Sequence, residues 1–163
     1  MRILVISDSH GSLANLEKVL DMHPEAEHVI FLGDGVREAE EASFIYDNIQ
    51  FHLVAGNCDF GSSYPSTAVT EIAGKRILYT HGHTMNVKYG YNAAIERAKA
   101  EGADILLFGH THEAAVRYCD GLYLMNPGSV SRPRGSYYGS YGYIDIVDGG
   151  VMTAVVELKP RID

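Results

Sequence analysis

The chain has 163 residues, a length typical of one domain, and we expect a single domain over residues 1–163. Hydrophobic residues make up 46% and charged residues 21% of the sequence, which excludes a disordered chain, a collagen and a coiled coil. The 21 acidic and 13 basic residues give a net charge of −8. Because neutralisation of phosphates drives nonspecific nucleic-acid binding, this balance argues against a long nucleic acid as partner.

The apolar segments are too short to cross a membrane, because a membrane helix needs about 20 apolar residues in a row. The first apolar run ends at Ile6 and is followed by polar residues, which is typical of a strand rather than a signal peptide. We therefore expect no membrane partner and a cytoplasmic location. In that compartment Cys58 and Cys119 are expected to be reduced thiols, with a disulfide between them as the alternative.

The first part of the chain alternates between short apolar runs and helical patterns. Three runs predict strands, at residues 2–6, 28–32 and 51–55. Apolar residues at helical spacing from Leu13 to Leu20, after Ser12 as a plausible N-cap, predict one helix. A charged segment from Arg37 to about Tyr46 predicts a second. The resulting β-α-β-α-β order implies a parallel sheet.

The second part of the chain favours hairpins. The expected elements are a hairpin of strands 68–72 and 76–80, a helix over 87–101, a strand at 105–108, and short strands around Val116 and at 122–125, 141–147 and 151–158. We expect two sheets packed face to face, the first mostly parallel and the second largely antiparallel. The predicted fold class is α/β, a layered α/β/β/α sandwich of two packed mixed sheets with flanking helices.

Five loops combine glycine with Asp, His or Asn at the point where a predicted strand ends. They are Asp-Ser-His at 8–10, Gly-Asp-Gly at 33–35, Gly-Asn-Cys-Asp at 56–59, His-Gly-His at 81–83 and Gly-His-Thr-His at 109–112. In open α/β sheets, functional sites form at the carboxyl ends of the strands. We therefore expect the five loops to converge on one site.

Seven side chains in these loops are candidate metal ligands. They are Asp8, His10, Asp34, Asn57, His81, His110 and His112. Imidazole nitrogen together with carboxylate and amide oxygen suits divalent ions of intermediate hardness. Seven ligands exceed the four of one tetrahedral zinc ion and fit two ions ~3.5–4 Å apart that share a carboxylate. We expect two divalent metal ions, with manganese first and iron, zinc or nickel as alternatives.

The five motifs, in this order, resemble the calcineurin-like metallophosphoesterase superfamily, whose pattern is D-x-H, G-D, G-N, H and G-H-x-H. Chain length and the Asn-Pro-Gly-Ser sequence at 126–129 resemble its small YfcE-type phosphodiesterase branch. The resemblance implies hydrolysis of phosphodiester bonds by attack of a metal-bridging hydroxide. It also implies a ligand set: Asp8, His10 and His112 for one metal, Asn57, His81 and His110 for the other, and Asp34 as the bridge.

One residue departs from the family pattern. Many members have a histidine where this chain has Cys58, and a thiol with a pKa near ~8.5 is a poor acid in its place. We take His83 as the candidate replacement, beside Asp34 and Asn57 as the other candidate catalytic residues. Candidate substrate-binding residues are Asn57, Cys58 and Arg134. Arg134 and its neighbour Arg132 either bind a substrate phosphate or form an exposed basic loop.

The sequence alone leaves three functions open. The first is a phosphodiesterase acting on a small phosphoester. The second is a phosphomonoesterase or nucleotidase. The third is a non-catalytic scaffold, as in the retromer subunit of this fold. A tyrosine-rich stretch from Tyr137 to Tyr143 packs within the protein, stacks on a base or aryl ester of the substrate, or forms the contact patch of a homodimer or higher homo-oligomer.

Overall fold

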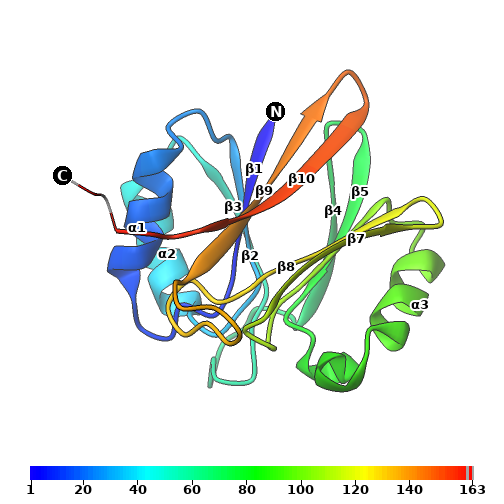
Figure 1. The fold of residues 1–163 in the computed structure, drawn as a ribbon, viewed down its shortest axis with the longest axis horizontal. Helices are drawn as coiled ribbons and strands as arrows, with labels where there is room; N and C mark the ends of the chain where they lie inside the picture. The colour runs from blue at the N-terminus through cyan, green and yellow to red at the C-terminus, as the bar shows by residue number, and fades with distance from the viewer. Residues whose placement is uncertain (161, 163) are drawn as a thin grey trace.

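The computed structural model describes residues 1–160 and 162 and shows two five-stranded sheets packed face to face (Figure 1). The first sheet contains, in spatial order, β10 (Gly150–Glu157), β9 (Ser140–Val147), β1 (Arg2–Ile6), β2 (His28–Phe31) and β3 (Gln50–Leu53). The second contains β4 (Thr67–Ile72), β5 (Lys75–Thr80), β6 (Ile105–Phe108), β8 (Leu122–Pro127) and β7 (Ala114–Cys119).

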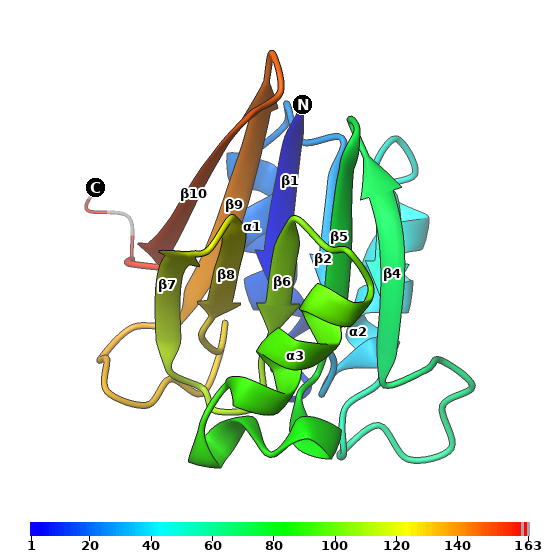
Figure 2. The same ribbon diagram turned by 90° about the vertical axis from the view of Figure 1, so that its right-hand side faces the viewer.

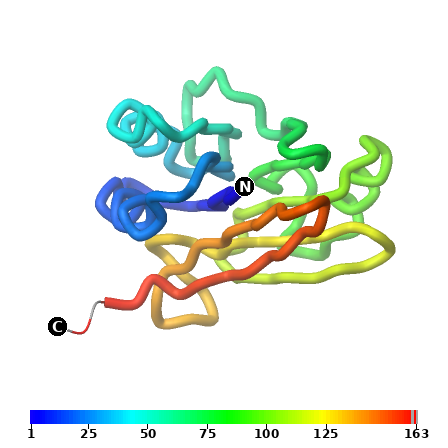
Figure 3. The backbone as a smooth tube through the Cα atoms, turned by 90° about the horizontal axis from the view of Figure 1, so that it is seen from above, coloured from blue at the N-terminus to red at the C-terminus, as the bar shows by residue number. Residues whose placement is uncertain are grey.

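Helices cover both outer faces of the pair of sheets. Helices α1 (Leu13–Met22) and α2 (Val36–Ile45) lie on the first sheet, and α3 (Asn92–Ala100) lies on the second (Figures 1 and 2). Seen from above, the four layers follow one another across the molecule (Figure 3). The predicted α/β/β/α sandwich is confirmed. Among the described residues no helix is long and apolar enough to cross a membrane.

The expected split into a mostly parallel and a largely antiparallel sheet is wrong. Each sheet has two parallel and two antiparallel pairings. The reason is that hairpins supply strands to both sheets: β9 and β10 extend the first, while β4 with β5 and β7 with β8 complete the second. A hairpin needs no crossover, so it adds antiparallel strands at the edges of a parallel centre.

The central position of β1 explains its continuous apolar run. Leu4 and Ile6 face α1 and α2, whereas Ile3 and Val5 face the second sheet, and all four are fully buried. A strand buried on both faces has no polar side to alternate with. The sequence of β1 is therefore apolar without interruption from Ile3 to Ile6. Because the strand is buried on both faces, it also fixes the position of the loop that follows it.

The helix predicted over 87–101 begins later than expected. A short 3₁₀ turn, Val87–Tyr89, comes first, and α3 starts only at Asn92. Gly90 between them has a φ of 140°, which breaks the helical path. Val87 is buried against Gly82, which has no side chain and leaves space for it. Burial of Val87 beside the His-Gly-His loop at 81–83 is therefore favoured over extension of the helix toward its N-terminus.

The tyrosine-rich stretch is largely used for internal packing. Tyr141 is buried and its hydroxyl lies 2.8 Å from His23 Nε2. The Tyr143 ring lies under the Arg2 guanidinium, 4.4 Å from the ring centroid. Tyr137, in contrast, is 88% exposed. The packing alternative is therefore right for Tyr141 and Tyr143, and a homodimer stays a prediction. Cys58 and Cys119 are free thiols.

Removing the ion pair that joins β1 to β9 should lower stability. Arg2 donates to both carboxylate oxygens of Asp145, from Nε at 2.8 Å and from Nη2 at 2.7 Å. This bond holds the pKa of Asp145 below its ordinary value. A depressed carboxyl pKa contributes stability that is present above the unfolded pKa and is lost as the pH falls through the folded one. We expect Asp145→Asn to reduce the free energy of unfolding by about 1–2 kcal/mol at pH 7.

Urea unfolding at pH 7 and in acid below pH 4 measures this contribution. The difference between wild type and Asp145→Asn should shrink as the pH falls below the ordinary pKa of Asp145, and it should be smallest below the lowered folded pKa, where the carboxyl group is protonated in both states. Asp148→Asn, in the exposed turn between β9 and β10, is the matched control. An equal loss in the control, or a difference that does not change with pH, would contradict the assignment.

Candidate metal centre

The five polar loops meet at one edge of the sandwich, at the bottom of Figures 1 and 2. They follow β1, β2, β3, β5 and β6, and these strands run parallel within their sheets. The carboxyl ends of parallel strands share one sheet edge, and face-to-face packing brings the two edges together. The site therefore lies on the seam between the sheets.

Five of the seven candidate ligands have a left-handed backbone. Their φ values are 57° for Asp8, 43° for His10, 58° for Asp34, 69° for His110 and 61° for His112. Each such residue other than glycine costs about 1–3 kcal/mol and persists only where surrounding contacts enforce it. The concentration of this strain in one set of loops is typical of a functional site.

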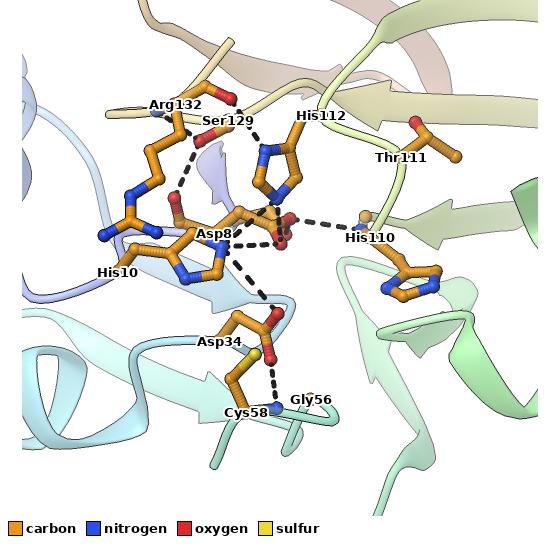
Figure 4. Close-up of polar contacts among 12 residues, drawn as sticks. Asp8, His10, Asp34, Gly56, Cys58, His110, Thr111, His112, Ser129 and Arg132 are labelled. Carbon is orange, nitrogen blue, oxygen red and sulfur yellow. Dashed lines mark hydrogen bonds and ion pairs between the residues drawn. The ribbon is translucent and has the colours of Figure 1, made fainter. Parts of the chain in front are cut away.

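The first group of donor atoms comes from Asp8, His10 and His112 (Figure 4). The Nε2 atoms of His10 and His112 are 3.1 Å apart. Asp8 Oδ1 lies 3.1 Å from His112 Nε2 and 3.6 Å from His10 Nε2. The other oxygen, Asp8 Oδ2, accepts a hydrogen bond from the backbone N–H of His110, which turns Oδ1 toward the two imidazoles.

The second group contains Asp34, Asn57, His81 and His110 and is centred on His81. Its Nε2 atom lies 3.0 Å from Asn57 Oδ1, 3.1 Å from His110 Nδ1 and 3.4 Å from Asp34 Oδ2. Asp34 Oδ2 is also 3.8 Å from His10 Nε2 of the first group. Asp34 is therefore the residue that faces both groups, and all seven predicted ligands come together.

These residues fit a pair of divalent ions. Two nitrogen or oxygen ligands of one ion, each about 2.1 Å from it, lie about 3.0–3.4 Å apart, as most of these donor atoms do. Asp8 Oδ1 is buried and has no hydrogen-bond partner in the described part of the chain, which is costly for a carboxylate unless a cation faces it. His81 Nδ1 contacts the Leu32 carbonyl oxygen at 2.7 Å, and His112 Nδ1 contacts that of Arg132 at 2.7 Å. Each carbonyl fixes the proton on Nδ1, so that Nε2 presents its lone pair to the site.

The electrostatics of the site favour the ligand state of most groups. Burial opposes the charge of Asp8, but contacts from His10 and His112 outweigh it and hold the pKa of Asp8 well below its usual range. Burial and the charge of His81 lower the pKa of His110 to about 4, so its imidazole is neutral at pH 7. Burial likewise disfavours a charge on His81, but Asp34 and Asp8 raise its pKa. A proton on His81 therefore competes with a metal as the pH falls.

Asp59 orients the loop that carries Asp34. Its carboxylate accepts four backbone hydrogen bonds: from Asp34 at 2.7 Å, Gly35 at 2.9 Å, Val36 at 3.0 Å and Gly56 at 2.8 Å. Three of these donors belong to the start of α2. Asp59 was not predicted as a functional residue, because a helix cap supplied from a different loop leaves no short-range pattern in the chain.

Asp34 itself is held by the neighbouring loop. The Cys58 N–H donates to Asp34 Oδ1 at 2.8 Å, which leaves Oδ2 facing the imidazoles (Figure 4). A Cβ atom at Gly56 would collide with Asp34 Oδ1, so this close approach requires glycine. The glycine of the Gly-Asn motif thus serves the carboxylate shared by both donor groups.

Residues of the Asn-Pro-Gly-Ser sequence at 126–129 hydrogen-bond to the loops that carry the donor side chains. Asn126 is fully buried and donates to the Gly109 carbonyl oxygen and to Thr111 Oγ1, each at 3.0 Å. Ser129 Oγ donates to the Asp8 carbonyl oxygen at 2.7 Å. Both residues position ligand-bearing loops, which the sequence alone did not reveal.

His83 lies beside His81, whereas Cys58 lies beside Asp34. The His83 ring centroid is 5.3 Å from that of His81, and His83 Nδ1 is buried without a hydrogen-bond partner among the described residues. Burial and the charge of His81 lower the pKa of His83. Cys58 is exposed. Partial desolvation, and to a smaller extent the negative charge of Asp34, raise the pKa of its thiol, which is therefore neutral at pH 7.

Two clefts open beside the donor groups. The α2-side cleft, of about 600 Å³, is lined by His10, Asp34, Cys58, Phe60 and Arg132 among others. The α3-side cleft, of about 630 Å³, is lined by Lys88, Tyr89, Thr111, Arg117 and Arg134 among others. The structure therefore separates the two arginines that the sequence grouped together, and it places Arg134 outside the donor groups.

Comparison with known proteins accounts for this arrangement. The model of the calcineurin-like phosphoesterase superfamily domain matches residues 1–149. The chain belongs to this family. The calcineurin-like family uses divalent metal ions, which agrees with the two groups of donor atoms found here. The similarity to this family deduced from the five motifs is thus confirmed.

Several calcineurin-like proteins resemble this chain along most of its length. The probable metallophosphoesterase YsnB of Bacillus subtilis is 32% identical over 90% of this chain and 85% of its own. The phosphodiesterase YfcE of Escherichia coli is 29% identical over 89% and 88%. A crystal structure of a predicted phosphoesterase from Streptococcus pneumoniae superposes with a TM-score of 0.82 at 31% identity, covering 96% of this chain and 88% of that one.

The same comparisons include a vacuolar protein sorting protein. Vacuolar protein sorting-associated protein 29 of Schizosaccharomyces pombe is 29% identical over 80% of this chain and 73% of its own. The family therefore contains proteins named for sorting as well as proteins named for phosphoester hydrolysis. The donor groups of the individual chain, rather than the fold, must decide between these functions.

Proposed function

We propose that this protein is a dinuclear-metal phosphodiesterase acting on small phosphodiesters. The observation that carries the proposal is the pair of donor groups that share Asp34, whose Oδ2 lies 3.4 Å from His81 Nε2 and 3.8 Å from His10 Nε2. Two divalent ions bound there would acidify a water molecule for attack on phosphorus and neutralise the phosphoryl oxygens. The likeness to YfcE supports a diester rather than a monoester as substrate.

The side chains of this protein divide the remaining tasks. Asp34 keeps both donor groups in register, and we assign contact with a substrate oxygen to Asn57, whose Oδ1 lies 3.0 Å from His81 Nε2 next to exposed Cys58. His83 is neutral at pH 7 because burial lowers its pKa, so it acts as a hydrogen-bond donor near the leaving group rather than as a charged acid. The mixed ligand set without a required thiolate favours manganese.

A paired assay with defined metal content tests the proposal. The protein is stripped with a chelator, reloaded with manganese, iron, zinc or nickel, and assayed on bis(p-nitrophenyl) phosphate and on p-nitrophenyl phosphate. We expect no turnover after stripping, recovery with manganese, and preference for the diester. Preference for the monoester would identify a phosphomonoesterase or nucleotidase instead. Full activity after stripping would exclude the metal mechanism.

A non-catalytic scaffold is the second candidate, and the likeness to the vacuolar protein sorting protein favours it. The complete set of seven donor side chains argues against it, because a scaffold has no need for buried unpaired carboxylate and imidazole groups. Calorimetric titration with manganese, together with the phosphoester assays on the same preparation, distinguishes the two. Two bound ions per chain without turnover of any phosphoester would favour the scaffold.

Replacing Cys58 by alanine should reduce kcat less than about threefold, because a neutral thiol adds little to proton transfer, whereas a general acid contributes about 10²–10⁴-fold. The measurement is a series of substituted phenyl diesters with leaving groups of different pKa. In wild type we expect the rate to fall steeply as the leaving group becomes less acidic. Cys119→Ala, at the far end of β7, is the control. A large loss in Cys58→Ala at unchanged metal content would show that the thiol is catalytic.

A further inference from the structure

The α3-side cleft concentrates positive charge on a negatively charged protein. Three of the 13 basic residues of the chain, Lys88, Arg117 and Arg134, line this one cleft, and Glu113 is the one acidic residue among the described residues that line it. All three basic side chains are exposed, and none forms an ion pair with another described residue. Their charge is therefore available to an anionic ligand.

Two of the three basic residues of this cleft, Lys88 and Arg134, lie on segments that contact the loops carrying the donor groups. Thr111, which lines the cleft, lies between the two histidines of the Gly-His-Thr-His loop. The backbone N–H of Arg134 donates to the His112 carbonyl oxygen at 2.9 Å. Lys88 follows Val87, whose side chain packs against Gly82 in the His-Gly-His loop. The cleft thus borders the loops that hold the donor side chains, although its lining includes Thr111 from these loops and none of the seven donor residues.

The α2-side cleft, in contrast, is lined by more acidic than basic residues. Although Arg37 and Arg132 line the α2-side cleft, four acidic residues line it as well: Asp34, Glu38, Glu40 and Asp59. Its rim carries Phe60, which is 92% exposed. The segment from Arg132 to Arg134 runs between the clefts and directs one arginine to each. A phosphodiester has two substituents on one phosphorus, and the two clefts offer each of them a different environment.

We propose that the α3-side cleft binds a second phosphate group of the substrate, carried on the arm opposite to the leaving group. This inference rests on the proposed function and specifies its substrate class as a phosphodiester with a further terminal phosphate. Guanidinium groups bind phosphate oxygens through paired hydrogen bonds, which suits Arg117 and Arg134. The Tyr89 ring, 91% exposed, and Tyr91, over which Arg117 lies at 4.9 Å, provide aromatic surface for the connecting group.

Two diesters with the same leaving group test the inference. One is thymidine 5′-(p-nitrophenyl phosphate), and the other is the same compound with a phosphate on the 3′ oxygen. With manganese-loaded protein at low ionic strength, we expect kcat/KM to be about tenfold higher for the 3′-phosphorylated compound, mainly through KM. The advantage should decrease as salt screens the cleft.

Variants locate the effect. Lys88→Ala/Arg134→Ala should reduce the ratio of the two kcat/KM values to near one, and Arg134→Lys should retain part of it. The matched control, Lys99→Ala/Lys159→Ala, removes two exposed charges outside the cleft and should keep the ratio of wild type. Binding of thymidine 3′,5′-bisphosphate and of thymidine 5′-monophosphate, measured by calorimetry on the same proteins, gives a second readout that needs no turnover.

The outcomes separate the inference from the function on which it rests. Equal kcat/KM for the two diesters, with equal binding of the two nucleotides, would refute the second phosphate site while leaving the phosphodiesterase intact. A ratio that persists in the Lys88→Ala/Arg134→Ala variant would refute it as well. Tighter binding of the bisphosphate, lost in that variant but without turnover of either diester, would support the site and refute the proposed activity.

Discussion

Replacing Asp34 by asparagine should lower kcat by about 10³-fold or more. The Oδ2 atom of Asp34 is the one that faces both donor groups, 3.4 Å from His81 Nε2 and 3.8 Å from His10 Nε2. A pair of catalytic metal ions contributes several kcal/mol to the transition state, and each 1.36 kcal/mol corresponds to a factor of ten in rate. Asparagine has the same shape, but it lacks the charge that attracts two cations.

The loss should come from the metal centre rather than from unfolding. Asp34 lies on a loop, and its Oδ1 atom accepts a hydrogen bond from the Cys58 N–H that an asparagine oxygen can also accept. If the amide oxygen takes that bond, the amide nitrogen faces His81 and His10, where it cannot ligate a cation. We therefore expect reduced metal content at nearly unchanged thermal stability.

Metal analysis, calorimetry and diester hydrolysis on the same preparation check this expectation. Glu41→Gln, an equivalent change on the exposed face of α2, is the control and should behave as wild type. Near-normal kcat with two bound ions in Asp34→Asn would show that Asp34 does not link the two groups. A collapse of thermal stability would instead indicate a structural role.

The parts of the fold that rest on local patterns were predictable. The apolar run of β1 indicates a strand buried on both faces, and alternation of strands with helices fixes the parallel centre of the first sheet. The late start of α3 was not predictable from periodicity. It depends on the packing of Val87 against Gly82, a contact made by residues whose spacing gives no helical or strand signal.

In the site, too, the residues of short motifs were predictable from the sequence, whereas contacts between residues far apart in the chain were not. The seven donor side chains belong to five short motifs, and their convergence could be expected from the parallel strands that precede them and from the packing of the two sheets. The bonds of Asp59 to the start of α2 join residues 23–25 positions apart, and no repeat or spacing marks them. The separation of Arg132 from Arg134 depends on the path of a loop between two clefts, which composition does not specify.

Replacing Asp59 by alanine should weaken metal binding and raise the manganese concentration needed for half-maximal activity by about 10–100-fold. Residues that orient metal ligands typically contribute this factor to affinity. Without the carboxylate, the backbone N–H groups of Asp34, Gly35, Val36 and Gly56 lose their common acceptor. The loop that carries Asp34 would then be free to move away from His81.

Stability should fall as well. A hydrogen bond to a charged group contributes about 1.5–3 kcal/mol, and the four bonds to Asp59 are not additive because water replaces some of them. We expect Asp59→Ala to reduce the free energy of unfolding by about 2–4 kcal/mol in the metal-free protein. Asp47→Ala, in the exposed turn before β3, provides the control for loss of an aspartate outside this network.

The manganese dependence distinguishes a positioning role from a structural one. All seven donor side chains remain in Asp59→Ala, so saturating manganese should restore most of the wild-type kcat and also raise the unfolding temperature toward that of wild type. A residue that only stabilises the fold would lower the unfolding temperature without changing the half-activating manganese concentration. If kcat stays low when both sites are filled, then Asp59 acts on the reaction itself and its assignment as a positioning residue is wrong.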